Sequence, residues 1–149
     1  MKRLLIFITV MLIGNALLSQ NINSAEKGSK ILLTKAPKLI SEKFNNECPG
    51  IKPKWYKEGD KYEAIYSDGT TKLNHSITFD KTGTIESKES ELDYKEYPAS
   101  INQYYSRRFP EEKYRIIQCE ASTGEKYYYS KRKNEIIKFD TSGNYISKR

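Results

Sequence analysis

The hydrophobic and polar positions of the chain form a pattern that occurs twice. In the segment PKLISEKFNNECP, the apolar side chains Ile40 and Phe44 are four residues apart, which places them on one face of a helix. In the later segment PASINQYYSRRFP, Ile101 and Tyr105 have the same spacing at the same distance from the opening proline. The two segments therefore predict two equivalent amphipathic helices.

A proline opens each predicted helix, and a second proline closes it. Pro37 and Pro98 suit the first helical position, because proline has a fixed helical φ and lacks only an N–H that would be unpaired there. Pro49 and Pro110 follow the apolar residues and cannot continue the helix.

Each helix is followed by short segments rich in Tyr, Ile, Trp and Thr, separated by turns that often contain glycine. The first set reads IKPKWYK, KYEAIY, KLNHSITF and TIES, and the second reads KYRIIQC, KYYYS, NEIIKF and NYIS. Such segments are typical of β-strands joined by hairpins. The expected fold class is α+β: two tandem repeats, 37–89 and 98–149, each with one helix packed on a four-stranded antiparallel sheet and joined by a charged linker, 90–97.

The last hairpin of each repeat contains the motif Phe-Asp-x-x-Gly. In FDTSGN, Asp140, Ser142 and Asn144 place oxygen donors at alternate positions, as in a calcium loop. The equivalent FDKTGT offers a weaker donor set, and no bidentate glutamate follows FDTSGN before the chain ends. Asp at the start of a turn and Gly three residues later predict a type I turn instead.

The N-terminal region has the layout of an export signal. A basic start is followed by an apolar run, Leu4–Leu18, and then by small and polar residues. The run of about 15 residues is shorter than the ~20 needed to span a bilayer, so a membrane anchor is the weaker alternative. We expect residues 1–19 to be a signal peptide, 20–36 to be an N-terminal segment, and the mature protein to be periplasmic or secreted without a stable membrane anchor.

The repeated motif resembles a known family. An opening Pro, apolar residues three and seven positions later, a second Pro, an aromatic residue, Tyr-x-Ala/Tyr and a final Phe-Asp-x-x-Gly are similar to PepSY-like proteins, and more closely to the β-lactamase-inhibitor-like (BLIP-like) periplasmic proteins. This resemblance covers 37–149 and implies an exported, non-enzymatic domain. The relatives it implies include β-lactamase inhibitory proteins and inhibitory pro-segments of metallopeptidases. Cys48 departs from the pattern, because an apolar or aromatic residue is expected there.

Charge adds little to this picture. The net charge is +7, but Lys alternates with Glu and Asp along most of the chain. Mixed charge is typical of a solvated surface rather than of a stripe that follows phosphates. We therefore expect no nucleic-acid partner.

The residues that could support catalysis are few. His75 is the only histidine, and neither a metal-binding His or Cys spacing nor a Gly-x-Ser-x-Gly turn is present. Counting by twos from Phe79 places His75 on the face of Ile77, near the end of a strand. We expect no enzyme, no catalytic residue, no metal site and no cofactor.

The two cysteines leave one question open. In an exported protein Cys48 and Cys119 could be oxidised to a disulfide. Cys48 falls at the end of the first predicted helix and should point toward the core, whereas strand parity places Cys119 on the outer face of the sheet. A bridge needs Cα atoms within about 7 Å, so the repeat argues against it without excluding it.

A sheet with helices on one face leaves the other face open for binding. If Tyr62, Ala64 and Tyr66 pack on the helix in the first repeat, and Tyr127 and Tyr129 in the second, the alternate residues point outward. The predicted binding residues are Tyr56, Glu63, Ile65, Arg115, Ile117, Lys126 and Tyr128. Aromatic residues and Arg are common anchors in protein interfaces, although Tyr also suits strands by shape alone.

Two functions fit this surface. The first is a module that docks onto an exported protein and inhibits or regulates it. The second is a module for an anionic glycan or envelope surface, in which Tyr stacks on sugar rings and Lys or Arg pairs with acidic groups. Added salt should weaken the second kind of binding more steeply than a desolvated protein interface.

Overall fold

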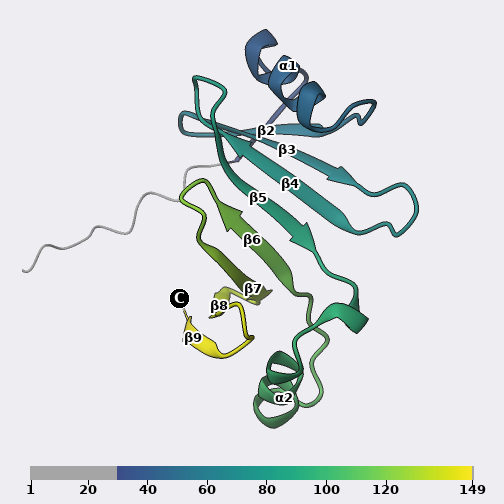
Figure 1. The fold of residues 1–149 in the computed structure, drawn as a ribbon, viewed down its shortest axis with the longest axis vertical. Coiled ribbons are helices and arrows are strands. Elements are labelled where there is room, and N and C mark those ends of the chain that lie inside the picture. Colours follow the sequence, from purple (N-terminus) through teal and green to yellow (C-terminus); the bar gives the residue numbers. More distant parts are fainter. Residues whose placement is uncertain (1–29, 149) are drawn as a thin grey trace, which may run out of the picture.

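The strands of this protein form one continuous antiparallel sheet. The structure is a computed structural model, and it describes residues 30–148. Nine strands follow one another across the sheet in chain order, from β1 to β9 (Figure 1). The elements are β1 (Ile31–Leu33), α1 (Lys38–Glu47), β2 (Lys54–Glu58), β3 (Lys61–Ser67), β4 (Asn74–Phe79), β5 (Ile85–Glu91), the 3₁₀ turn η1 (Tyr94–Glu96), α2 (Ala99–Arg108), β6 (Ile117–Ala121), β7 (Lys126–Arg132), β8 (Glu135–Phe139) and β9 (Tyr145–Lys148).

The prediction of two units, each a helix on its own four-stranded sheet, is wrong. Strand β5 pairs with β6 in register from Ser87↔Ala121 to Glu91↔Ile117, so the strands on both sides of the predicted linker belong to one sheet. An additional strand, β1, pairs with β2 in a segment where the sequence analysis assigns none. The result is a mostly-β fold with two helices. The strand segments predicted from the sequence do not reveal which strands pair, because each open sheet edge can pair with any other.

Both helices begin directly after the predicted prolines and bury the predicted residues. Ile40 and Phe44 of α1, like Ile101 and Tyr105 of α2, are almost completely buried. The helices end at the C-cap residues Cys48 and Phe109. The backbone N–H of each donates to the carbonyl four residues earlier. Helical spacing and proline therefore sufficed to place both helices along the chain.

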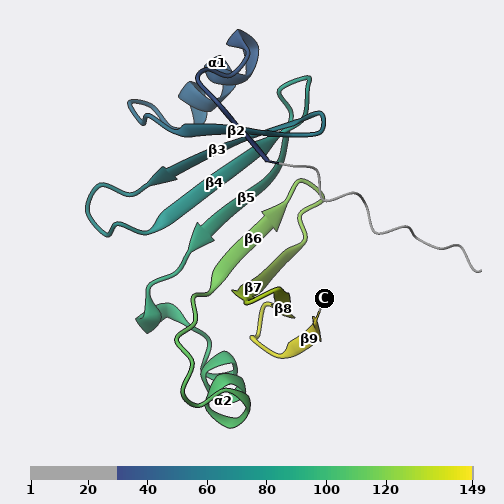
Figure 2. The ribbon, with the colours of Figure 1, turned by 180° about the vertical axis from the view of Figure 1, so that it is seen from behind.

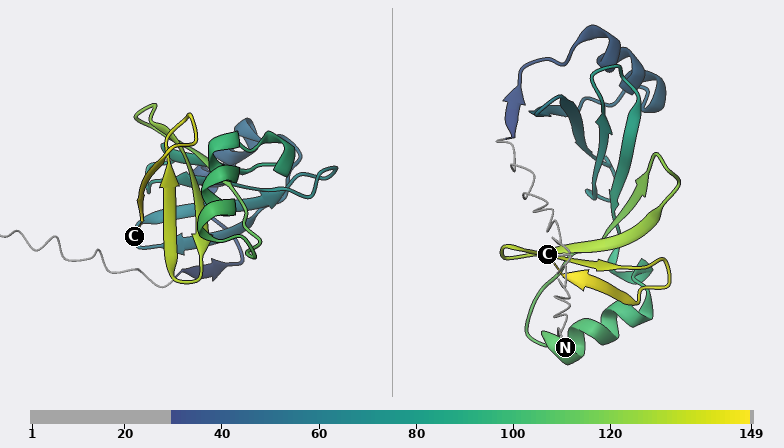
Figure 3. Two further views of the ribbon diagram at one scale, coloured as in Figure 1. Left: turned by 90° about the horizontal axis from the view of Figure 1, so that it is seen from below. Right: turned by 90° about the vertical axis from the view of Figure 1, so that its left-hand side faces the viewer.

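The helices pack on the same face of the sheet, over two separate hydrophobic clusters. The cluster under α1 includes Trp55, Ala64, Ile77 and Phe79, whereas the cluster under α2 includes Ile116, Ile137 and Phe139. The helix-side face of the two central strands is polar, with Lys88 on β5 directly opposite Glu120 on β6. Helices α1 and α2 consequently lie at opposite ends of the molecule (Figures 2 and 3). Among residues 30–148, no helix packs on the opposite face of the sheet.

A glycine in the β8–β9 turn fits tightly against the start of α2. Gly143 has φ +80°, and a methyl group added there would overlap Ser100 Oγ and lie 2.6 Å from Pro98 Cβ. In the β4–β5 turn, Gly83 has the same φ, but its nearest neighbour, Lys43 Cγ, would be 3.4 Å from such a methyl group. Both turns need the left-handed conformation, but only the β8–β9 turn also lacks space for a methyl group.

Gly143→Ala should therefore destabilise the protein more than Gly83→Ala. Each substitution costs about 1 kcal/mol because alanine disfavours the left-handed region. The overlap at Gly143 adds roughly 1–3 kcal/mol, as in other over-packed sites. Urea unfolding of the two variants measures the difference. Equal losses of stability would show that the turn moves away from α2 without cost.

Candidate functional site

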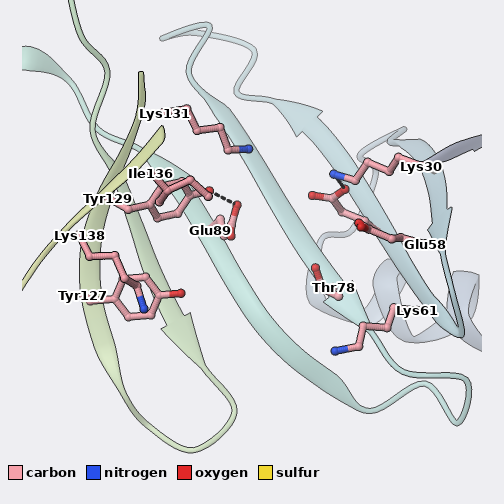
Figure 4. A pocket seen from close by; sticks show the side chains of 11 residues that line it. Lys30, Glu58, Lys61, Thr78, Glu89, Tyr127, Tyr129, Lys131, Ile136 and Lys138 are labelled. Atoms are coloured by element: carbon pink, nitrogen blue, oxygen red, sulfur yellow. Dashed lines mark hydrogen bonds and ion pairs between the residues drawn. The ribbon is translucent and has the colours of Figure 1, made fainter. Parts of the chain in front are cut away.

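The face of the sheet without helices contains a hollow of about 420 Å³. Its two sides come from different parts of the chain, one from strands β2 to β5 and the other from strands β7 and β8 (Figure 4). The lining residues are Lys30, Glu58, Lys61, Glu63, Thr78, Glu89, Tyr127, Tyr129, Lys131, Ile136 and Lys138.

A hydrogen bond across strand β6 joins the two sides of the hollow. Tyr129 Oη on β7 donates to Glu89 Oε2 on β5 at 2.7 Å, although β6 lies between these strands. Neighbouring strands are about 4.8 Å apart, so the two side chains span two strand spacings. The residue between them on β6 is Cys119, which pairs with Glu89 in the ladder and is only 2% exposed. A small side chain at this position leaves space for the Tyr–Glu bridge above it.

The hollow continues along the sheet toward the 110–117 segment. A second hollow shares Lys30, Glu63, Glu89, Tyr129 and Lys131 with the first, and a third shares Lys131, Arg115 and Ile117 with the second. Together they form one elongated depression, which we call the concave groove. Lys131 lines all three of its parts.

The two sides of the groove differ in how their charges are compensated. On the β2–β5 side, Lys30 pairs with Glu63, and Lys61 lies 2.6 Å from Glu86. On the β7–β8 side, Lys131 and Lys138 have no ion-pair partner among the described residues.

The two unpaired lysines of the β7–β8 side lie over tyrosine rings. Lys138 Nζ is 3.8 Å from the centre of the Tyr127 ring, and Lys131 Nζ is 5.8 Å from that of Tyr129. An ammonium group over an aromatic face is attracted by the ring quadrupole, so these contacts orient the two cations.

Burial raises the pKa of one thiol and of two tyrosine hydroxyls in the groove. It raises the pKa of the Cys119 thiol, which favours the unreactive protonated form. Burial is also the main reason that the pKa values of Tyr127 and Tyr129 are raised, and the hydrogen bond to Glu89 raises that of Tyr129 further. The hydroxyl groups in the groove can donate and accept hydrogen bonds, but they remain protonated.

Five of the seven predicted binding residues lie on the face of the groove. Glu63, Ile65, Arg115 and Ile117 line the groove itself, and Tyr56 is paired directly with Glu63 in the β2–β3 ladder. Whether these residues bind a partner stays a prediction.

The predicted orientation of the two residues on β7 is wrong. Tyr128 packs into the hydrophobic cluster under α2, and Lys126 lies on that same helix-side face, where its ammonium group is 3.3 Å from Glu120. The sequence predicted that Tyr127, like Tyr62, packs on the helix of its repeat. In the ladders, however, Tyr62 pairs with Phe79 and Tyr128 with Phe139, so Tyr128 is the structural equivalent of Tyr62. A shift of one residue exchanges the two faces of a strand.

That shift also concealed several groove residues from the sequence analysis. Tyr127, Tyr129 and Lys131 alternate with the helix-side residues of β7, and Ile136 and Lys138 do so on β8. A signal was present in the sequence. Counting back by twos from the core residue Phe139 places Ile137 in the core, and therefore places Ile136 and Lys138 on the open face.

The two cysteines lie on opposite faces of the sheet, and both are free. Cys48 contacts the cluster under α1, and its Sγ is 3.4 Å from Tyr66 Oη. Cys119 faces the groove. The question left open by the sequence is therefore answered: the structure contains no bridge between them.

His75 packs against the sheet rather than facing a cluster of reactive groups. Its ring stacks on Tyr66 at a centroid distance of 5.4 Å, and its Nδ1 is 3.1 Å from Ser90 Oγ. Within residues 30–148, no group of three or more His, Cys, Asp or Glu side chains is arranged to hold a metal ion.

The Phe-Asp-x-x-Gly motifs form turns, as predicted. Asp140 Oδ1 accepts hydrogen bonds from the backbone N–H groups of Ser142 and Asn144, at 2.9 and 2.8 Å. Asp80 makes the equivalent bonds to Thr82 and Thr84 in the β4–β5 turn. Each carboxylate thus accepts hydrogen bonds from its own turn. These hydrogen bonds lower the pKa of both aspartates.

The pKa shifts predict a dependence of stability on pH. A lowered pKa in the folded state means that each aspartate stabilises the fold above its unfolded pKa, near 3.9, and that this contribution is lost as the pH falls through the folded value. The double variant Asp80→Asn/Asp140→Asn keeps one acceptor oxygen at each position, which can still accept the backbone N–H bonds, but it cannot titrate. Its stability should fall less than that of the wild type between pH 5 and pH 2, as thermal unfolding would measure. Parallel curves for the two proteins would contradict this assignment.

Comparison with known proteins supports the fold. No protein-family model and no curated protein sequence matches the chain. Three similar solved structures all come from Bacteroides. A protein of B. eggerthii DSM 20697 described as periplasmic has 14% identity and a TM-score of 0.62, over 77% of this chain and 88% of that one. A DUF2874 family protein of B. uniformis ATCC 8492 has 13% identity and a TM-score of 0.63, over 77% and 89%. A BLIP-like protein of B. fragilis NCTC 9343 has 13% identity and a TM-score of 0.55, over 78% and 87%.

At these identities the three structures establish a shared fold. The sequence-based resemblance to BLIP-like proteins is confirmed at that level. The resemblance to PepSY-like proteins stays a prediction.

The hydrogen bond across the groove gives a testable prediction. Tyr129→Phe removes the donor to Glu89, and a hydrogen bond to a charged group contributes roughly 1.5–3 kcal/mol. We expect a stability loss of that order and faster alkylation of Cys119, because its cover is loosened. Tyr128→Phe is the matched control on the other face of β7, since the Tyr128 hydroxyl has no hydrogen-bond partner in the described part of the chain. Unchanged alkylation in Tyr129→Phe would show that the bridge does not cover the thiol.

Proposed function

We propose that this protein is an exported, non-enzymatic binding module that docks onto another exported protein through the concave groove and inhibits or regulates it. The observation that carries the proposal is the groove itself. It is an open depression built from both halves of the sheet, in which the exposed side chain of Ile136 lies among charged residues, some ion-paired and some without a partner. Apolar and charged side chains together provide anchoring contacts and selectivity in protein interfaces.

The comparisons support this proposal in two ways. One structural neighbour is described as periplasmic and another as BLIP-like, which fits an exported protein of inhibitor-like fold. The described residues contain no helix that is long and apolar enough to cross a membrane. The predicted signal peptide, 1–19, lies outside the described residues.

The alternative function, binding of an anionic glycan, receives less support from the groove. Sugar recognition by stacking needs an accessible aromatic face. The Tyr127 ring is covered by Lys138, and Tyr129 is only 5% exposed. The tyrosine faces are therefore already occupied by the protein's own lysines or by burial.

Photo-crosslinking in the cell tests the proposal. Ile136 is 41% exposed and lines the groove, so a p-benzoylphenylalanine placed there should react with a docked partner. We expect a discrete protein adduct, identified by mass spectrometry in the organism that makes the chain. The matched controls carry the same group at Leu39, which is exposed on α1, and at Lys126, on the helix-side face of β7.

The outcomes separate the alternatives. An adduct from position 136 that neither control gives supports docking through the groove. The same adducts from all three positions, or none from any, would overturn the proposal. A hydrolytic activity of the purified protein that His75→Ala abolishes would show instead that it is an enzyme.

A further inference from the structure

The concave groove has a basic side whose cations lack partners within the chain, and we infer that this side receives an acidic side chain from an exposed loop of the partner protein. This inference rests on the proposed function, because it names the chemistry of the partner at the same groove. The residues that carry it are Lys131 and Lys138.

Lys131, Lys138 and, at the far end of the groove, Lys113 have no ion-pair partner among the described residues. Three other cations along it have carboxylate partners: Lys30 with Glu63, Lys61 with Glu86, and Arg115 with Glu91. Lys131 and Lys138 face the same depression from β7 and β8, and no carboxylate of the described chain lies within ion-pair distance of either. Charge complementarity therefore favours a partner that supplies the missing carboxylate.

Glu89, a carboxylate that lines the groove together with both lysines, is already in use. Glu89 accepts the hydrogen bond from Tyr129 at 2.7 Å and lies across the groove floor rather than against the lysines (Figure 4). The two tyrosine rings beneath Lys131 and Lys138 restrict the positions of the ammonium groups. Cations that are held in place before binding lose less conformational freedom when a ligand arrives.

The shape of the groove favours a loop as the ligand. It runs from Ile136 and Lys138 past Lys131 to Ile117 and Arg115, and it is open along its length. An exposed apolar side chain, Ile136, lies between the two lysines and offers an apolar contact beside the charges. A protein loop carries acidic and apolar side chains together, whereas an anionic polysaccharide offers no matching apolar group.

A display experiment tests the inference without knowledge of the natural partner. A phage library of disulfide-closed loops of seven random residues is selected against the immobilised full-length protein. We expect loops enriched in Asp and Glu together with an apolar residue. Lys131→Gln/Lys138→Gln should weaken a selected loop about tenfold and reduce the salt dependence of its binding. Lys131→Glu/Lys138→Glu should select loops enriched in Lys and Arg instead.

The matched control is Lys81→Gln/Lys126→Gln, which removes the same charge from outside the groove and should leave binding of the selected loop unchanged.

Loops that show no charge preference, or that bind the Lys131/Lys138 variants as well as the wild type, would overturn this inference but leave docking through the groove intact. If no loop is selected and crosslinking at Ile136 also fails, the proposed function fails with it. Binding of polygalacturonate that requires both lysines, without any loop selected, would overturn the inference in favour of a glycan.

Discussion

The ladder between β5 and β6 is the interaction on which the rest of this structure depends. Its backbone pairing, from Ser87↔Ala121 to Glu91↔Ile117, turns two helix-and-hairpin halves into a single sheet. Paired antiparallel strands twist relative to one another by about 20–25°, and this twist accumulates across nine strands. One face of the continuous sheet is thereby hollowed, and residues of β2–β4 come to face residues of β7–β8 across it.

The polarity of the two faces follows from the same ladder. On the helix side, α1 and α2 cover only the outer parts of the sheet, and the uncovered centre carries the polar pair Lys88 and Glu120. On the groove side, the centre is the narrow place where Tyr129 reaches Glu89 over the small residue Cys119. The fold thus buries its apolar surface in two places on one face and leaves the groove on the other.

The proposed function is consequently a property of a surface assembled from both halves. Neither half alone contains the groove, because its basic side comes from β7 and β8 and its charge-compensated side from β2 to β5. Both proposals depend on the fact that these two sides face each other across the groove: the docking module, and the acidic loop as its ligand. The unpaired Lys131 and Lys138 would be ordinary surface lysines on a flat sheet.

The sequence by itself determined the local structure: the two helices, the burial of Ile40, Phe44, Ile101 and Tyr105, eight of the strands, and the Asp-Gly turns. These depend on short spacings, proline geometry and side-chain hydrogen bonds within a few residues. Only the tertiary structure decided that β5 pairs with β6, that β1 joins the sheet, and which tyrosines of β7 face the groove. Such features arise because sheet edges pair through backbone groups common to all residues, and because a shift of one residue reverses every side chain of a strand.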